Sequence, residues 1–266
     1  MEFALVGAPE PTVAAFFDVD NTLMQGASIF HLARGLHRRR FFTTADIAKA
    51  TWQQMYFRII GVEDPDHVAE ARSSALAFIA GHRVDELAEV THEIFDETMA
   101  HRIWPGTRAL AQMHLDAAGE RVWLITAAPI EIATIIAQRL GVTGALGTVA
   151  EQIDGVYTGK LVGEMLHGGA KAEAVRAIAE REGLDLGRCA AYSDSSNDLP
   201  MLSLVGAPCA INPDLRLREH ARANGWRVHD YRTGRKAARA GVLTAAGVGS
   251  VVGAVAAGAA VRRRLR

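Results

Sequence analysis

The sequence predicts an α/β fold, a Rossmann-like parallel sheet, with an inserted all-helical segment and a hydrophobic C-terminal tail helix. After residue 104, short apolar runs alternate with amphipathic helical stretches, the order that builds a parallel sheet covered by helices. Between residues 28 and 101 the apolar spacing is helical throughout, and residues 241–261 carry no charge. The predicted boundaries are 12–27 with 102–232 for the core, 28–101 for the helical cap, 233–240 for a linker and 241–261 for the tail.

The elements are expected in a definite order. A short apolar run at residues 12–17 reads as a buried strand that ends in acids. Four helices fit the insert, with breaks near Thr43, Pro65 and Gly81, and a hairpin is expected at Asp154-Gly155. The rest of the core is expected as helices at 107–118, 130–140, 170–182, 197–204 and 213–224, and as strands at 121–125, 189–193, 209–211 and 226–229.

The composition excludes two broad classes of protein. Lysine and arginine number 29 against 30 aspartate and glutamate, and a net charge of −1 argues against a dedicated nucleic-acid binder. With 49% hydrophobic residues the chain can bury a core, which excludes global disorder. Cys189 and Cys209 lie in apolar stretches and are expected as buried thiols in a reducing compartment.

The C-terminal run predicts a membrane-associated tail. Residues 241–261 are 21 uncharged residues between two basic clusters, and about 20 apolar residues can cross the hydrocarbon layer as a transmembrane helix. Because alanine and glycine supply little insertion energy, a buried or surface-lying helix, or a flexible tail, is the alternative. The opening residues show no signal-peptide pattern, so we expect a cytoplasmic catalytic domain that the tail attaches to the cytoplasmic membrane.

Polar side chains fall at the carboxyl ends of predicted strands, where open α/β sheets place their ligands. Carboxylates that converge in one cleft repel each other unless a hard cation neutralises them, and oxygen ligands suit Mg²⁺. A lysine and a threonine hydroxyl beside that cation would hold phosphate oxygens. The pattern predicts magnesium-assisted phosphoryl transfer with an aspartate nucleophile. The residues concerned are Asp18, Asp20, Thr126, Lys171, Asp194 and Asp198.

Each of these pieces also has a purely structural explanation. An acidic turn after a strand is common, and Asn21 could form such a turn through its side chain. Thr126 could cap the following helix, and Lys160 competes with Lys171 as the phosphate-binding lysine. Lys171 is preferred because it begins a helix after Gly168 and Gly169, where backbone N–H groups favour an anion. The occurrence of all the pieces in order, each at a strand end, favours the catalytic explanation.

These residues resemble the haloacid dehalogenase (HAD) superfamily of phosphatases. Residues 16–23 (FFDVDNTL) resemble its first motif, residues 124–126 (LIT) its second, Lys171 its third and residues 192–198 (YSDSSND) its fourth. The helical insert resembles the cap of the phosphoserine-phosphatase-like branch, subfamily IB. The resemblance covers roughly residues 12 to 231 and implies a HAD fold.

The resemblance also implies a role for each matched residue. Asp18 would attack phosphorus, and Asp20 would protonate the leaving oxygen and then activate water. Thr126, Lys171 and Asn197 would bind the phosphate. The implied magnesium site consists of Asp18, Asp20 through its backbone carbonyl, Asp194, and Asp198 either as a ligand or through water.

The expected activity is Mg²⁺-dependent hydrolysis of a phosphomonoester through an aspartyl-phosphate, on a small-molecule or lipid-head-group phosphate. Phosphoserine phosphatases place a glutamate shortly after the first motif, whereas residues 24–28 here are MQGAS, without an acid. Phosphoserine is therefore not the favoured substrate on sequence grounds. Two alternatives stay open: a phosphotransferase of the same fold, or a membrane-tethered non-catalytic regulatory protein. The sequence specifies no oligomeric state.

Overall fold

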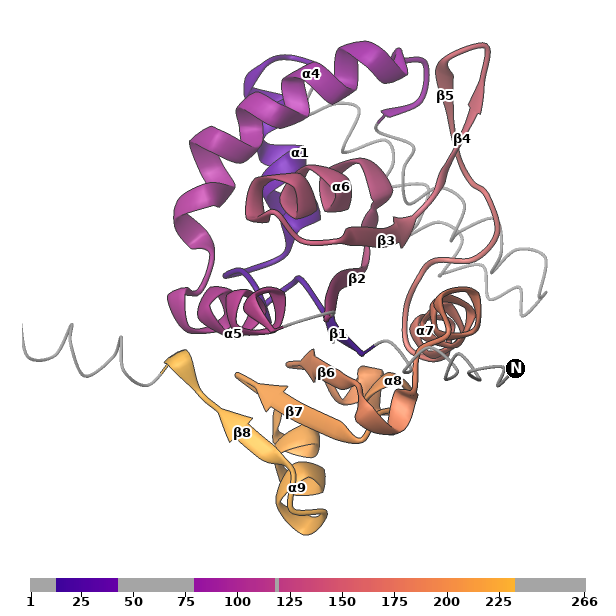
Figure 1. Cartoon of the computed structure of the whole chain (residues 1–266). Helices are drawn as coiled ribbons and strands as arrows, with labels where there is room; N and C mark the ends of the chain where they lie inside the picture. Colours follow the sequence, from indigo (N-terminus) through magenta and orange to yellow (C-terminus); the bar gives the residue numbers. More distant parts are fainter. Residues whose placement is uncertain (1–12, 43–78, 118–119, 233–266) are drawn as a thin grey trace, which may run out of the picture. The chain divides into compact units, whose positions relative to one another are not determined.

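The computed structural model describes residues 13–42, 79–117 and 120–232, and its centre is a six-stranded sheet (Figure 1). The strand order is β3-β2-β1-β6-β7-β8. The pairs β1–β2, β1–β6, β2–β3 and β6–β7 are parallel, which confirms the predicted α/β class. The strands are β1 (Ala14–Phe17), β2 (Arg121–Pro129), β3 (Gly144–Thr148), β6 (Ala190–Ser193), β7 (Ala207–Ile211) and β8 (Arg227–His229).

The first strand lies at the centre of the sheet, which explains its apolar sequence. All four residues of β1 are buried, since neighbouring strands cover both edges and helices cover both faces. Phe17 lies level with Leu124 of β2 on one side and with Tyr192 of β6 on the other. The chain leaving β1 therefore enters the crevice where the strand order reverses, the usual position of a ligand in such sheets.

Helices cover both faces of the sheet. Phe16 packs in a core cluster with Val175 and Ile178 of α7, whereas the next residue, Phe17, meets His114 of α5. Because successive strand residues point to opposite faces, α7 and α5 lie on opposite sides of β1. The core helices are α5 (Pro105–Asp116), α6 (Ile130–Leu140), α7 (Gly169–Glu182), α8 (Leu199–Leu202) and α9 (Leu215–Ala223).

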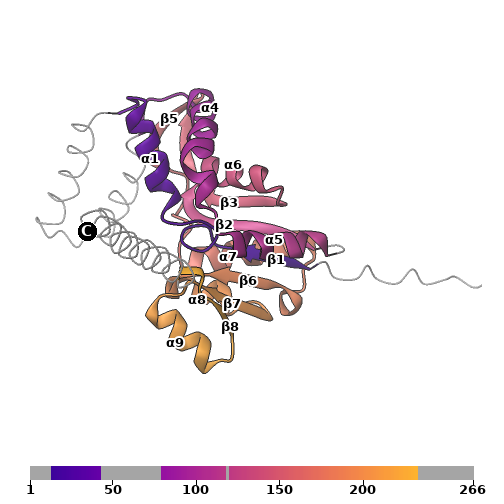
Figure 2. The same ribbon diagram turned by 90° about the vertical axis from the view of Figure 1, so that its left-hand side faces the viewer.

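The described part of the insert is helical, as the sequence predicts. Helix α1 (Ser28–Arg38) runs beside α4 (Val84–Ile94), which continues as a π-helical turn at Phe95–Met99 and a 3₁₀ turn at Ala100–Arg102 (Figure 2). The two helices approach closely at Gly35, where a Cβ atom would lie 2.5 Å from Cγ2 of Ile94. The predicted breaks near Thr43 and Pro65 lie outside the described residues, and the boundaries of the cap stay a prediction.

A two-stranded hairpin joins the core to the chain returning from the insert. Strands β4 (Ala150–Ile153) and β5 (Val156–Leu161) are antiparallel around the predicted turn at Asp154-Gly155. Both turn residues have positive φ, the geometry of the tight hairpin turns that Asp-Gly favours. The Tyr157 N–H donates to the His82 carbonyl at 3.0 Å, and the Gly81 N–H donates to the Tyr157 carbonyl at 2.8 Å.

Three details differ from the sequence-based expectations. The edge strand β3 has no predicted counterpart, because its sequence GALGT lacks the β-branched or aromatic pattern that marks a strand. Strand β2 runs on to Pro129 instead of ending near Ile125. The expected helix at 197–204 is a 3₁₀ turn at Ser196–Asp198 followed by the short α8.

The predicted linker 233–240 and tail 241–261 lie outside the described residues. Within the described ranges, none of the helices combines the length and apolar character that a membrane crossing needs.

Candidate active site

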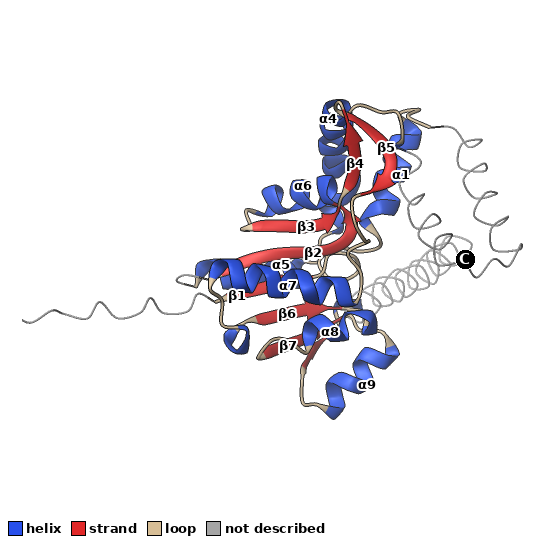
Figure 3. Cartoon of the chain, turned by 90° about the vertical axis from the view of Figure 1, so that its right-hand side faces the viewer, coloured by secondary structure: helices blue, strands red, loops and turns tan. Residues whose placement is uncertain are grey.

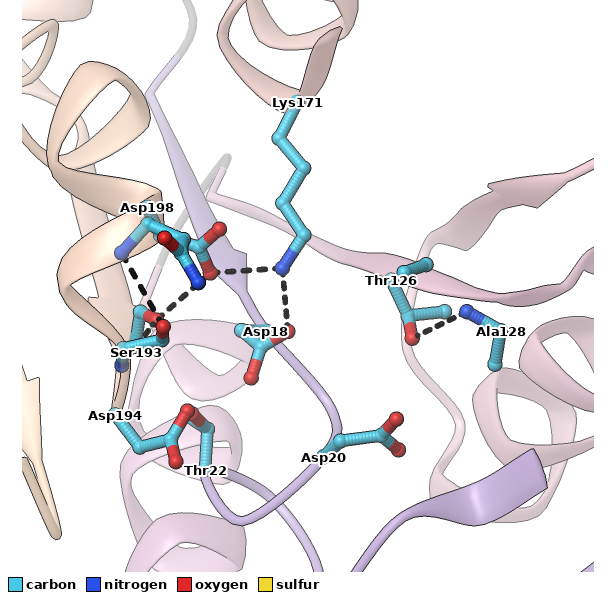
Figure 4. A network of polar contacts seen from close by, with 12 residues as sticks. Asp18, Asp20, Thr22, Thr126, Ala128, Lys171, Ser193, Asp194 and Asp198 are labelled. Carbon is cyan, nitrogen blue, oxygen red and sulfur yellow. Dashed lines mark hydrogen bonds and ion pairs between the residues drawn. The ribbon is translucent and has the colours of Figure 1, made fainter. Parts of the chain in front are cut away.

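Asp18 is the first residue after the central strand, and it is 5% exposed. Its backbone N–H donates to the Tyr192 carbonyl at 2.9 Å, which continues the β1–β6 pairing beyond the strand end. Its Oδ1 accepts from Nζ of Lys171 at 2.6 Å. Figure 4 shows Lys171 reaching from α7 toward this carboxylate. The fold thus joins two residues that are 153 positions apart.

Lys171 bridges two carboxylates. Besides Asp18, its Nζ donates to Oδ2 of Asp198 at 2.7 Å, and the lysine side chain is only 4% exposed. The Ser193 hydroxyl donates to the same Asp198 oxygen at 2.8 Å. Gly168, with φ of +55°, takes the backbone conformation that leads into α7. The ammonium is therefore held at the end of β1 with little rotational freedom.

Burial and charge set the protonation of this cluster. Burial raises the pKa of Asp18 to about 6, although the Lys171 charge opposes that rise. Burial, with the Asp18 and Asp198 charges, raises the pKa of Asp194 to about 7. For Lys171 burial favours the neutral amine, but the two neighbouring carboxylates outweigh it and raise the pKa. The site therefore holds more acidic groups than one lysine can neutralise.

Asp194 lies on a loop that hydrogen bonds hold in place. The Thr22 hydroxyl donates to Oδ1 of Asp194 at 3.4 Å. The Asp194 carbonyl accepts from the Asp214 N–H at 2.8 Å, and the Asp214 carboxylate accepts from the Ser196 N–H at 2.7 Å. Asp214 also caps α9 by accepting from the Leu217 N–H. One aspartate thus fixes both the loop after β6 and the start of α9.

Asp20 is tied to the first helix of the insert. Its Oδ1 accepts from the Ser28 N–H at 2.8 Å and from the Ser28 hydroxyl at 2.6 Å. The first residue of α1 thus supplies two hydrogen-bond donors to the Asp20 side chain. In Figure 4, Asp20 lies on the loop beyond Asp18, with its carboxylate on the side of Thr126. The Asn212 amide holds this loop by donating to the Asn21 carbonyl at 3.0 Å.

Of the two remaining predicted residues, Thr126 is buried and Asn197 is exposed. Thr126 is 1% exposed in β2, and its Oγ1 accepts from the Ala128 N–H at 3.1 Å. This bond leaves the hydroxyl hydrogen for an acceptor such as a phosphate oxygen. Asn197 is exposed in the turn after β6, and its backbone N–H donates to the Ser195 hydroxyl at 3.2 Å. The structure thus gathers Asp18, Lys171 and Asp198 by direct bonds and leaves Asn197 at the surface.

The cluster fits a magnesium ion only with help from oxygen atoms other than side chains. Among the described residues, no three histidine, cysteine or acidic side chains are arranged to hold a metal. Oδ2 of Asp198 already accepts from Lys171 and Ser193. Asp18 and Asp194 have raised pKa values, in part because each carboxylate lies in the field of other negative charges. Mg²⁺ commonly uses one or two carboxylates and completes its shell with water and phosphate oxygens, which suits this pair.

Several residues that hold the site together are not predicted from the sequence. Ser28 binds Asp20, Ser193 binds Asp198, and the Thr107 hydroxyl donates to the Thr22 carbonyl at 2.9 Å. Ser193 stands inside the fourth motif, and Ser28 opens a predicted helix, so both had a sequence signal. Thr107 had none, because its partner is 85 residues away.

Comparison with known proteins places the chain in a family. Residues 15–203 match the model of the haloacid dehalogenase-like hydrolases. The phosphoserine phosphatase SerB1 of Mycobacterium tuberculosis is 58% identical over 252 residues, which cover 95% of this chain and 82% of that protein. The histidinol-phosphatase of Neisseria meningitidis serogroup C is 33% identical over 224 residues, which cover 82% of this chain and 98% of that protein.

A solved structure has the same fold. The crystal structure of a protein of unknown function from Bordetella pertussis Tohama I superposes with a TM-score of 0.70 at 32% identity, over 82% of this chain and 99% of that one. The family match and the relatives agree with the motifs, and they confirm the predicted HAD-type phosphatase. The chain belongs to the haloacid dehalogenase-like hydrolase family.

Proposed function

We propose that this chain hydrolyses phosphomonoesters with Asp18 as nucleophile, Asp20 as general acid and base, and Mg²⁺ as cofactor. The observation that supports this proposal best is the buried bridge from Lys171 to Asp18 and Asp198 at the end of the central strand. Burying a cation with its carboxylate partners costs desolvation energy, which their attraction offsets only when the geometry is good. Here it leaves a positive group beside the proposed nucleophile, where phosphate oxygens would arrive.

In the first step, a carboxylate oxygen of Asp18 forms a bond to phosphorus while the bond from phosphorus to the ester oxygen breaks. Asp20 gives its proton to the leaving oxygen, so the alcohol departs neutral. Lys171 and the Thr126 hydroxyl donate to the phosphoryl oxygens as charge develops there. The protein is left with an acyl phosphate on Asp18.

In the second step, water attacks the phosphorus of that acyl phosphate and inorganic phosphate leaves. Asp20 takes the proton from the water, which returns both carboxylates to their starting states. The tie between Asp20 and Ser28 places this acid and base at the first turn of the insert. Through that tie, movement of the insert would change the position of Asp20 as well as the access of water.

Magnesium would be held by the Asp18 and Asp194 carboxylates with the backbone carbonyl of Asp20. Once bound, it would neutralise negative charge on the phosphate and on the two carboxylates. Asp198 would act through Lys171, since both of its described contacts at Oδ2 hold it beside that ammonium. Asn197 at the surface of the same loop would reach a phosphate only from outside the buried cluster.

The substrate class that we propose is the phosphate ester of a 2-amino alcohol. The two relatives are named for phosphoserine and for histidinol phosphate, and both compounds carry an amine on the carbon next to the ester carbon. The 58% identity to the mycobacterial protein makes phosphoserine the first compound to test, despite the missing acid after the first motif. Phosphoethanolamine, a lipid head group, belongs to the same chemical class.

The test is phosphate release from p-nitrophenyl phosphate, phosphoserine and phosphoethanolamine, with Mg²⁺ and with EDTA. We expect Mg²⁺-dependent turnover that Asp18→Asn abolishes. The matched control is Asp154→Asn, the same change at the exposed hairpin turn, which should leave turnover unchanged. Equal inactivity of wild type and Asp18→Asn on all esters would support the non-catalytic alternative. Release of the alcohol with phosphate passed to an added alcohol would support a phosphotransferase.

A further inference from the structure

We propose that the Glu131 carboxylate binds the ammonium group of the substrate. This inference rests on the proposed function and identifies how the amino-alcohol class would be selected. Residues 24–28 contain no acid, so this segment offers no carboxylate to an ammonium group. Glu131 is the first acidic residue after strand β2, which contains Thr126.

Glu131 lies where the chain leaves the phosphate-binding edge of the sheet. Strand β2 contains Thr126 and ends at Pro129, and α6 begins at the next residue, Ile130. Glu131 is thus in the first turn of α6, at the carboxyl end of the strand beside β1. Figure 3 shows this end of β2 bending toward the base of the hairpin formed by β4 and β5. Ligands of open α/β sheets occupy this edge.

Only one of the two Glu131 carboxylate oxygens accepts a hydrogen bond from the described residues. The Tyr157 hydroxyl donates to Oε1 at 2.8 Å, whereas Oε2 is buried and has no hydrogen-bond donor among the described residues. A buried carboxylate oxygen without a donor is strongly unfavourable. A substrate ammonium supplies both the donor and the opposite charge.

Tyr157 fixes the Glu131 carboxylate at a junction of three segments. Its side chain is 1% exposed, and its backbone pairs with His82 and Gly81, the chain that returns from the insert. Burial and the negative charge of Glu131 raise the pKa of the Tyr157 hydroxyl, so the hydroxyl stays protonated and keeps donating to Oε1. The Tyr157–Glu131 bond therefore joins the start of α6 to the hairpin, and the Tyr157 backbone joins the hairpin to the chain that returns from the insert.

The amine of a 2-amino alcohol phosphate is suited to this position. Only three atoms, the ester oxygen and two carbons, separate its nitrogen from phosphorus. A phosphate held at Thr126 and Lys171 would therefore keep the ammonium near the same sheet edge. An amine further along the leaving group, or none, would lose this contact.

The experiment compares paired substrates that differ only in the amine. Phosphoethanolamine is paired with n-propyl phosphate, and phosphoserine with 3-phosphooxypropionate. The readout is the ratio of kcat/KM for the amine to kcat/KM for its partner. We expect wild type to favour the amine and Glu131→Gln to lower the ratio by roughly tenfold to a hundredfold, as for a lost hydrogen bond to a charged group. Glu131→Asp should retain part of the preference.

The matched control is Glu151→Gln in β4. Glu151 also accepts from a hydroxyl, that of Thr158, at 2.6 Å, but it lies within the hairpin, so the ratio should stay at the wild-type value. An unchanged ratio in folded Glu131→Gln, or no amine preference in wild type, would overturn this inference while leaving phosphatase activity on p-nitrophenyl phosphate intact. Inactivity on every ester would instead refute the proposed function.

Discussion

Lys171 shows how a single residue decides the chemistry of the site. Its ammonium is buried, and only the Asp18 and Asp198 carboxylates make that position tolerable. The positive charge of Lys171 also keeps the pKa of Asp18 lower than burial alone would make it. At neutral pH, Asp18 is then mainly ionised, as a nucleophile must be.

Replacing Lys171 by methionine should remove both effects. We expect kcat/KM to fall by at least about a hundredfold, the loss seen when one donor to a transition-state oxygen is removed. Two buried carboxylates would also lose their cation, which should lower the free energy of unfolding by roughly 3–5 kcal/mol. Steady-state kinetics and urea unfolding measure the two quantities.

Two further variants complete the test: a control at an exposed lysine, and a change at Lys171 that keeps the charge. Lys160→Met removes an exposed lysine and should change neither quantity. Lys171→Arg keeps the charge but replaces a compact ammonium by a planar fork, so it should lose activity with less loss of stability. Full activity in Lys171→Met would show that Lys160, or no lysine, holds the phosphate.

At the scale of elements, the close crossing of α1 and α4 holds the described part of the insert together. Gly35 is buried on α1 and faces Ile94, which is fully buried at the end of α4. This close approach requires a glycine inside a helix, which is about 1 kcal/mol less favourable there than alanine. The contact matters for the site because Ser28, which binds Asp20, begins the same helix.

The crossing predicts a specific coupling between two substitutions. Gly35→Ala should destabilise, since its methyl would lie 2.5 Å from Cγ2 of Ile94 and overpacking costs roughly 1–3 kcal/mol, more than the gain in helix propensity. Ile94→Ala should cost about 2–5 kcal/mol through the cavity it leaves. In the double variant the new methyl fills part of that cavity.

The double variant should therefore be more stable than the sum of the single changes implies, by about 0.5–3 kcal/mol. Urea unfolding of the four proteins measures this coupling energy. Additive losses would mean that α1 and α4 do not pack through these two residues.

At the scale of the whole molecule, the fold collects acids that the metal-free protein cannot fully neutralise. Asp18 comes from the end of β1 and Asp194 from the end of β6, and pairing of these strands makes the two carboxylates neighbours. Their pKa values rise to about 6 and about 7 from the ordinary aspartate value of 3.8. Both groups therefore bind protons more tightly in the folded than in the unfolded protein.

This difference predicts how stability depends on pH without metal. Between about pH 4 and pH 7 the folded state binds more protons at these two groups, so their contribution to stability is present below pH 4 and is lost as pH rises. Urea unfolding in EDTA should show wild type losing stability relative to Asp194→Asn over this window. Mg²⁺ at pH 8 should restore stability to wild type more than to the variant.

Because other groups titrate in the same range, the difference between the two proteins is the informative quantity. A difference that stays constant from pH 4 to pH 8 would contradict the raised pKa values. Equal stabilisation of both proteins by Mg²⁺ would contradict the assignment of Asp194 as a ligand.

Local patterns in the sequence determined the class of fold and most of the candidate site. The period of apolar residues depends only on neighbours along the chain, and it predicts α6 at its observed bounds. The motif around Asp18 and Asp20 is also local, because its residues lie next to one another in the sequence. Strand β3 was missed because an edge strand such as GALGT needs no strong apolar pattern. Its pairing with β2, in which Gly144 lies against Trp123, exists only in the folded chain.

Only the tertiary structure decided which polar groups meet. The bonds of Lys171 to Asp18 and Asp198, of Ser28 to Asp20 and of Tyr157 to Glu131 join residues between 8 and 153 positions apart. No periodicity encodes such distances, because they follow from strand register and from the packing of helices on the sheet. The sequence supplied the chemical groups. Packing determined which carboxylate has a cation, which lies at a helix N-terminus and which has a buried oxygen that no described residue donates to.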